Sequence, residues 1–155
     1  MPKLSLRRGF TLIELLVVIS IIALLSVVVF VALNPIKRFQ DARNSRRWSD
    51  VDNVLSAVHE YIVDNGGSLP TGLSTSMAEK QLGSCLTGGA TLCATAGTAC
   101  VDLTTPLAKY LKTIPVDSQT GTAATTAYSI AVDANNIVTV KSCSAENSVS
   151  VSISR

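Results

Sequence analysis

The chain has 155 residues, which suits one domain of ordinary size, and 47% of them are hydrophobic. Its 13 Lys and Arg residues and 11 Asp and Glu residues give a net charge of +2. These charges lie in blocks: basic at the N-terminus and over residues 37–47, acidic over 50–64, and balanced from 66 onward. A nucleic-acid-binding domain would carry excess cations on its folded body, so the charge distribution argues against that function.

An apolar segment at residues 15–33 excludes a simple soluble domain. Only Ser20 and Ser26 interrupt its 19 residues. At about 1.5 Å per helical residue the segment spans roughly 28 Å, close to the hydrocarbon thickness of a bilayer. The sequence therefore predicts a membrane-spanning helix, whose bounds we set at 10–34.

The basic residues before and after this helix roughly balance, so charge alone does not predict which way it crosses the membrane. The four cysteines predict its orientation instead. The cysteines, Cys85, Cys93, Cys100 and Cys143, all lie in the Ser/Thr-rich C-terminal part. An even number there indicates two disulfides and an oxidising compartment, which places the N-terminus inside and the body outside. Three pairings are possible, of which we favour Cys85 with Cys93 and Cys100 with Cys143. The spacings contain no Cys-x-x-Cys pair, which argues against a zinc or redox site.

A second, amphipathic helix is predicted over 35–65. Pro35 is expected to kink or interrupt the helix that precedes it. Apolar residues then recur at spacings of three and four, which predicts one buried stripe. This stripe consists of Trp48, Val51, Val54, Leu55, Val58, Tyr61 and Ile62. Asn65-Gly66-Gly67 provides a C-terminal stop, so the helix forms a stalk that needs a packing partner.

Residues 66–155 are predicted to form a small head. A capping box at Ser76–Glu79 and the Thr105-Pro106 pair each predict a short helix. Short β-rich runs at 127–132, 137–141 and 149–153 predict an antiparallel sheet of three or four strands, the first two joined by a turn at 133–136. With the sheet packed on the apolar stripe of the stalk, the fold class is α+β.

The N-terminus carries the most specific motif. A short basic stretch ends at Gly9, and the apolar helix that follows contains one acid, Glu14. An ordinary secretory signal would be cleaved after the apolar run, but Ala32 is preceded two positions earlier by the bulky Phe30. Cleavage between Gly9 and Phe10 would instead leave the apolar helix on the mature chain.

The stretch Arg-Gly-Phe-Thr-Leu-Ile-Glu at residues 8–14 resembles the class III leader and N-terminal helix of type IV pilins and of the pseudopilins of type II secretion systems. The resemblance implies that residues 1–9 are a leader and that a prepilin peptidase cuts after Gly9 and methylates the new amino terminus of Phe10. It also implies that Glu14 pairs with a charged N-terminal amine during filament assembly. A carboxylate inside a membrane helix costs about 2.5 to 3.5 kcal/mol on insertion scales, which favours a functional role over mere contact with lipid headgroups.

Three further features of the stalk and head bear on function. The basic and acidic blocks of the stalk would pair if parallel copies were staggered, or they would form a solvated face. His59 stands far in sequence from the cysteines, so we expect a surface or groove histidine rather than a zinc ligand or a catalytic base. The segment Asp117–Gly121 faintly resembles the calcium-binding loop of major pseudopilins, but it lacks further evident oxygen ligands and is predicted to be a plain turn.

The sequence thus predicts the structural subunit of a type IV pilus-like filament, serving adhesion, motility or DNA uptake. The precursor would be stored in the bacterial cytoplasmic membrane and assembled on a pilus assembly platform with copies of itself or related pilins. The first alternative is a pseudopilin of a type II secretion system. The second is a membrane-anchored surface protein with an uncleaved N-terminus. No nucleophile and base stand in a recognisable arrangement, so we expect no enzymatic activity, cofactor or metal.

Overall fold

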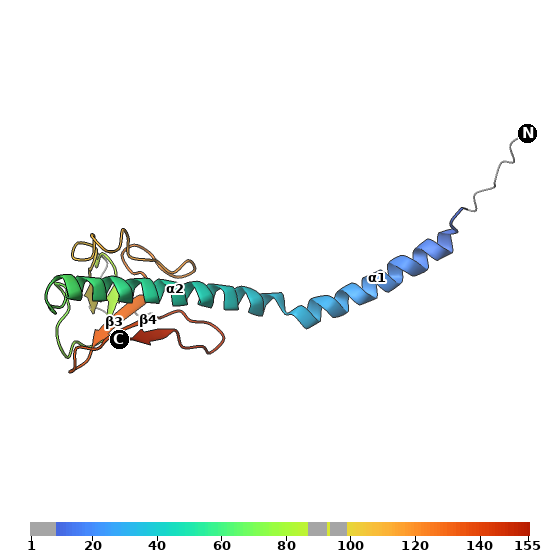
Figure 1. Cartoon of the computed structure of the whole chain (residues 1–155). Helices are drawn as coiled ribbons and strands as arrows, with labels where there is room; N and C mark the ends of the chain where they lie inside the picture. The colour runs from blue at the N-terminus through green and yellow to red at the C-terminus, as the bar shows by residue number, and fades with distance from the viewer. Residues whose placement is uncertain (1–8, 87–92, 94–98) are drawn as a thin grey trace, which may run out of the picture. The chain divides into compact units, whose positions relative to one another are not determined.

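The computed structural model describes residues 9–86, 93 and 99–155, in which two helices precede a small sheet (Figure 1). The helices are α1 (Leu12–Leu33) and α2 (Pro35–Asp64). The strands are β1 (Lys80–Leu82), β2 (Cys100–Val101), β3 (Tyr128–Val132), β4 (Val138–Ser142) and β5 (Ser152–Ser154). The chain divides into two compact units, Met1–Phe39 and Gln40–Arg155. Within the second unit α2 packs on the sheet, which confirms the predicted α+β class.

The helical region is interrupted at Asn34, the residue before Pro35. Asn34 adopts a left-handed conformation with φ 39°, which asparagine tolerates better than most residues. Its side-chain Oδ1 accepts from the amide of Lys37 at 3.4 Å, so Asn34 closes α1 and also caps α2. Pro35 is the first residue of α2, where a missing amide hydrogen costs nothing.

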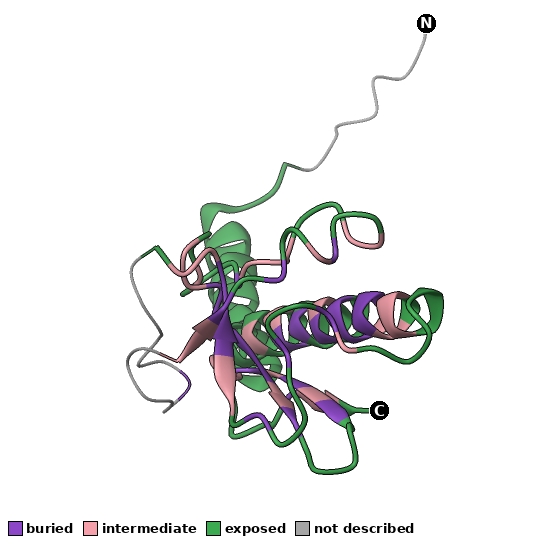
Figure 2. Ribbon diagram, turned by 90° about the vertical axis from the view of Figure 1, so that its left-hand side faces the viewer, coloured by how far each residue is buried: buried purple, intermediate pink, exposed green. Residues whose placement is uncertain are grey.

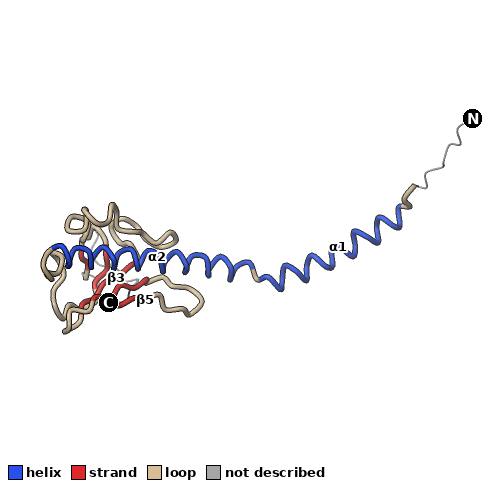
Figure 3. Tube along the Cα trace, in the orientation of Figure 1, coloured by secondary structure: helices blue, strands red, loops and turns tan. Residues whose placement is uncertain are grey.

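The five strands form one sheet in the order β2-β1-β3-β4-β5. The pairing is antiparallel except between β1 and β2, which run parallel. The β3–β4 hairpin was predicted, and its turn is held by Asp133, whose Oδ1 accepts from the amides of Asn135 and Ile137 at 2.7 and 2.8 Å. Strands β1 and β2 were not predicted, because segments of three and two residues carry no readable alternation. Loops make up most of the other described residues after α2 (Figure 3).

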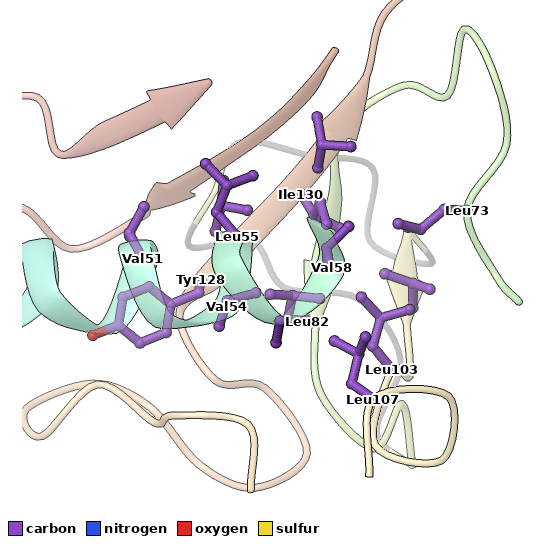
Figure 4. Close-up of a cluster of buried hydrophobic side chains, with 14 of the residues drawn as sticks. Val51, Val54, Leu55, Val58, Leu73, Leu82, Leu103, Leu107, Tyr128 and Ile130 are labelled. Atoms are coloured by element: carbon purple, nitrogen blue, oxygen red, sulfur yellow. The ribbon is translucent and has the colours of Figure 1, made fainter. Parts of the chain in front are cut away.

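The core lies between α2 and one face of the sheet, where buried residues of both elements meet (Figure 2). Val51, Val54, Leu55 and Val58 are fully buried, as the apolar stripe predicted. Their neighbours in the close-up of Figure 4 are the sheet residues Leu82, Tyr128 and Ile130 and the loop residues Leu73, Leu103 and Leu107. Each fully buried aliphatic side chain contributes about 1.5 to 3 kcal/mol, so this layer fixes the sheet on the helix. Trp48 does not belong to it, since 40% of its surface is exposed.

Two predicted helices of the head are wrong. Ser76 has φ 58°, outside the helical region, and its amide donates to the carbonyl of Asp133. Glu79 does not close a capping box but accepts from the Ser129 hydroxyl and the Lys141 ammonium, each at 2.6 Å. The segment after Thr105 forms turns rather than a helix, although Leu107 is fully buried. Tertiary contacts override local propensity at both places.

The last predicted strand, 149–153, is shorter than expected. Its pairing begins only at Ser152, opposite Lys141, and continues with Ile153 opposite Val140. The amide of Val149 instead donates to the carbonyl of Glu146 within a turn. Val151 is buried, but Val149 is 42% exposed, so the predicted run does not bury one face along its whole length.

Two disulfides close the head, Cys85–Cys100 and Cys93–Cys143. The prediction of two bridges is confirmed, but the favoured pairing is wrong. The reason lies in the sheet: β1 and β2 pair side by side, with Gln81 opposite Cys100, which brings the segment after β1 to Cys100. Cys143 directly follows β4 and is left to bond Cys93.

Removing the longer bridge is expected to cost more stability than removing the shorter one. The bridges span 15 and 50 residues, and loop-closure entropy then gives contributions of about 3 and about 4 kcal/mol. We expect Cys93→Ser/Cys143→Ser to lower the free energy of unfolding more than Cys85→Ser/Cys100→Ser, measured by urea denaturation. Peptide mapping without reduction should recover the two cross-links named above. Recovery of Cys85 linked to Cys93 would contradict both the pairing and the ranking.

Candidate functional site

The Gly9–Phe10 bond lies just before α1, outside any helix. Both residues are exposed, and Phe10 keeps 87% of its surface accessible. Apart from its chain neighbours, no described residue lies within 4 Å of the position that a side-chain carbon on Gly9 would occupy. A peptidase needs access to non-helical backbone at the bond it cuts, and Gly9 and Phe10 are both exposed and outside a helix.

Glu14 and Thr11 form a reciprocal capping box at the start of α1. The amide of Glu14 donates to Thr11 Oγ1 at 3.2 Å, while Glu14 Oε2 accepts from the Thr11 amide at 2.9 Å and from its hydroxyl at 2.7 Å. These contacts satisfy amide donors that a helix start leaves free. Glu14 therefore has a structural role within its own chain, besides the assembly role that the sequence predicts.

Helix α1 exposes all of its residues. The helical stretch Leu12–Asp64 contains an 18-residue window with a mean hydropathy of 3.3, and none of that window is buried. The hydroxyls of Ser20 and Ser26 donate to the carbonyls of Leu16 and Ile22, both at 2.8 Å, so these two polar groups need no water. Within the described part of the chain, this is one helix long and apolar enough to cross a membrane.

Comparison with known families finds one match at this end of the chain. The family described as "Prokaryotic N-terminal methylation motif" matches residues 4–30. These residues carry a prepilin-type signal. The resemblance of residues 8–14 to the class III leader of type IV pilins and pseudopilins is thereby confirmed. Comparison with curated proteins and with solved structures gives no match.

The prepilin-type signal implies processing by a prepilin peptidase and assembly into pilus-like filaments, and with α1 it fits a membrane-anchored precursor. The match covers residues 4–9 of the predicted leader, and with Gly9, Phe10 and Glu14 it includes the residues on which the sequence placed cleavage, methylation and assembly. These three roles remain predictions. The match ends within α1 and does not extend to the head.

A buried ion cluster at the start of the head is the main feature that the sequence analysis missed. Arg47 exposes only 2% of its side chain and Asp117 only 1%. Arg47 Nε donates to Asp117 Oδ2 at 2.5 Å, and its Nη1 donates to Glu146 Oε2 at 2.8 Å and to Asn44 Oδ1 at 3.0 Å. One guanidinium thus joins α2 to two loops that lie far away in sequence.

Glu146 is bound on its other side by Arg43. Arg43 Nε and Nη2 donate to its two carboxylate oxygens at 2.7 and 2.6 Å, a bidentate geometry that is stronger than a single bond. The backbone of Glu146 is held as well, since its amide donates to Asn44 Oδ1 at 3.0 Å and its carbonyl accepts from Asn44 Nδ2 at 2.9 Å. The loop that follows Cys143 is therefore fixed on α2 at both backbone and side chain.

The cluster depresses the pKa values of its two carboxyl groups. Burial alone would raise the pKa of Asp117, but the Arg47 guanidinium and the amides of Thr120 and Gln119 outweigh it and lower that pKa to about 2. The hydrogen bond from Arg43, followed by that from Arg47, lowers the pKa of Glu146 to about 2. Both groups stay ionised at any pH at which the protein is expected to work.

Acid is expected to destabilise the head through this cluster. Both carboxyl groups have folded pKa values of about 2, below their ordinary values of 3.8 and 4.5, so their contribution is complete above about pH 4.5 and is lost as the pH falls toward 2. For the buried Asp117 alone this amounts to about 2 kcal/mol. Urea denaturation across this range should show the loss, and Asp117→Asn should flatten it while lowering stability at neutral pH. A free energy of unfolding that is constant across the range would contradict the assignment.

The cluster revises the two hypotheses on the charged stalk. Arg47 is buried and Arg43 is only 33% exposed, and both already pair with carboxylates of their own chain, Glu146 and Asp117. Three acids of the block at 50–64 are also paired within the same chain. Asp52 lies 4.0 Å from the Arg155 guanidinium. Asp50 accepts from the Tyr128 hydroxyl at 2.7 Å, and Asp64 accepts from Lys109 and Tyr110 at 2.7 and 2.9 Å.

The segment Asp117–Gly121 forms a turn, as predicted. Asp117 Oδ1 accepts from the amides of Gln119 and Thr120 at 3.0 and 2.9 Å, and the Gly121 amide donates to the Asp117 carbonyl at 3.0 Å. Position 121 has no room for a side chain, because a Cβ on Gly121 would lie 2.5 Å from the carbonyl oxygen of Thr126. The carboxylate that the calcium resemblance singled out is thus used by its own turn and by Arg47.

Proposed function

We propose that this chain is the structural subunit of a type IV pilus-like filament, held in the cytoplasmic membrane as a precursor and assembled after cleavage and N-methylation. It acts by assembly rather than by catalysis. The observation that carries the proposal is a prepilin-type signal joined directly to a fully exposed apolar helix. Such a helix needs an apolar environment, which lipid supplies before assembly and neighbouring helices supply afterwards.

The composition of α1 supports the exchange of lipid for protein. Glu14 is its only charged residue. Apolar side chains gain little by leaving lipid for another helix, so association in a membrane depends on packing and on polar contacts. A carboxylate is the group that lipid disfavours most in α1, and a cation on a neighbouring subunit would stabilise it. The new amine of Phe10, four residues before Glu14, is the cation that cleavage would create.

Mass spectrometry of the protein extracted from membranes tests the processing step. We expect a mature chain that begins with N-methylated Phe10. Gly9→Val is expected to leave the leader uncleaved, because the resemblance makes Gly9 the residue on which the peptidase acts. An N-terminus at Met1 in the unaltered protein, or a cut after Ala32, would refute the proposal.

The prepilin-type signal is shared by pilins and pseudopilins, so a second measurement must separate them. Electron microscopy of material sheared from the cell surface should show filaments that contain the mature chain. We favour a pilus because two disulfides staple the head and because the Asp117 carboxylate is bound by Arg47 rather than free for a metal. A processed chain that never reaches the cell surface would favour a pseudopilin.

A further inference from the structure

Residues 40–64 of α2, which lie in the second compact unit, carry eight charged side chains. Six of these side chains have a partner in the same chain. The pairs are Asp41 with Asn147, Arg43 with Glu146, Arg47 with Asp117, Asp50 with Tyr128, Asp52 with Arg155 and Asp64 with Lys109. Within the described residues, Arg46 and Glu60 have neither an ion pair nor a hydrogen bond. They are exposed, and they are opposite in charge.

Arg46 and Glu60 lie on the same side of α2. They are 14 residues apart, which is two heptads and about 21 Å along a helix, and two heptads rotate a position by only about 40°. The space beside each is open. Arg46 lines a hollow of about 650 Å³ whose other walls include Ile114 and Thr126. Glu60 lines a second hollow of about 490 Å³, together with the half-buried His59.

We propose that Arg46 of one copy of this chain pairs with Glu60 of a second copy, with the two α2 helices parallel and offset by about 21 Å along their axes. This inference rests on the proposed filament and names its lateral register. A second copy is the occupant because one offset then uses both charges of α2 residues 40–64 that lack a partner within the described residues. A head-to-tail contact of this kind repeats without closing, which is what a fibre requires. At zero offset, by contrast, Arg46 would face Arg46 and Glu60 would face Glu60.

The pair would select a register rather than supply most of the binding energy. A single exposed ion pair contributes little, whereas like charges set against each other are strongly unfavourable at an interface. Packing of the helices would therefore drive association, and the charges would exclude the wrong offsets.

Charge reversal in cells that make the full chain tests the register. The amount of subunit in sheared filaments is compared with the amount left in the membrane. We expect Arg46→Glu and Glu60→Arg each to reduce filament recovery about tenfold or more, because each places like charges together. The double swap Arg46→Glu/Glu60→Arg should restore recovery to near the unaltered level. The control Arg46→Glu/Asp52→Arg has the same net charge as the swap but an offset of only about 9 Å, and it should stay low.

Cross-linking gives a second measurement that does not depend on charge-reversed variants. A chain with Arg46→Cys and Glu60→Cys together should form a ladder of multimers on mild oxidation, while each single substitution should not. Dimers from either single variant, or a double swap no better than the single reversals, would overturn the proposed register. Absence of filaments from the unaltered chain would instead refute the proposed function, and the register with it.

Discussion

Replacing Arg47 with alanine is expected to lower the free energy of unfolding of the head by about 3 to 5 kcal/mol, because it leaves the buried carboxylate of Asp117 without its cation. The same substitution removes a donor from Glu146 and frees Asn44 Oδ1 from one of its two bonds. The loops around Asp117 and Glu146 would then lose their common attachment to α2. Urea denaturation of the full chain in detergent would measure the change.

Arg46→Ala is the matched control, since it removes the same type of side chain from the preceding position of the same helix. Arg46 is exposed and unpaired within the described chain, so its loss should change stability by less than about 0.5 kcal/mol. The double variant Arg47→Ala/Asp117→Ala should cost less than the sum of its single variants, because the second change removes the group left unpaired by the first. Equal effects of Arg47→Ala and Arg46→Ala would contradict the role assigned to the cluster.

The cluster also illustrates which parts of the structure the sequence could predict. The buried face of α2 was predicted from Trp48 to Ile62 because its apolar residues recur at helical spacing, and its apolar residues from Val51 to Val58 are buried. Arg47 and Asn44 continue that face toward the N-terminus at spacings of three and four, and both are buried. Helical periodicity alone places Asn44 and Arg47 on the buried face. Because both are polar, however, the sequence predicts that they are buried only if their hydrogen-bonding partners are known.

Those partners lie far away in sequence. Asp117 is 70 residues from Arg47, and Glu146 is 99 residues from it. No local pattern connects such positions, and the sheet topology that brings them together depends on strands of two or three residues. The disulfide pairing failed for the same reason, because it follows from the parallel contact of β1 with β2. The prepilin-type signal was predictable, since it is contiguous and needs no tertiary contact to be recognised.

Replacing Glu14 is expected to remove the subunit from filaments while cleavage and membrane insertion continue. The structure complicates the usual alanine test, because Glu14 also caps α1 with Thr11. Glu14→Gln separates the two roles. Glutamine can still accept from the Thr11 amide and keep the capping box, but it carries no charge for an N-terminal amine. If the charge serves assembly, Glu14→Gln and Glu14→Ala should both reduce incorporation into filaments by at least about tenfold, which corresponds to about 1.4 kcal/mol.

Thr11→Ala is the complementary control, because it removes the hydroxyl from the capping box and leaves the carboxylate in place. Loss of a cap costs about 1 kcal/mol of helix stability, which a helix supported by lipid or by neighbouring helices can tolerate. Thr11→Ala should therefore still assemble, and immunoblots of membrane and sheared fractions would compare all three variants. Normal assembly of Glu14→Gln, with failure of both alanine variants, would assign Glu14 to capping and contradict its pairing with the amine of a neighbouring subunit.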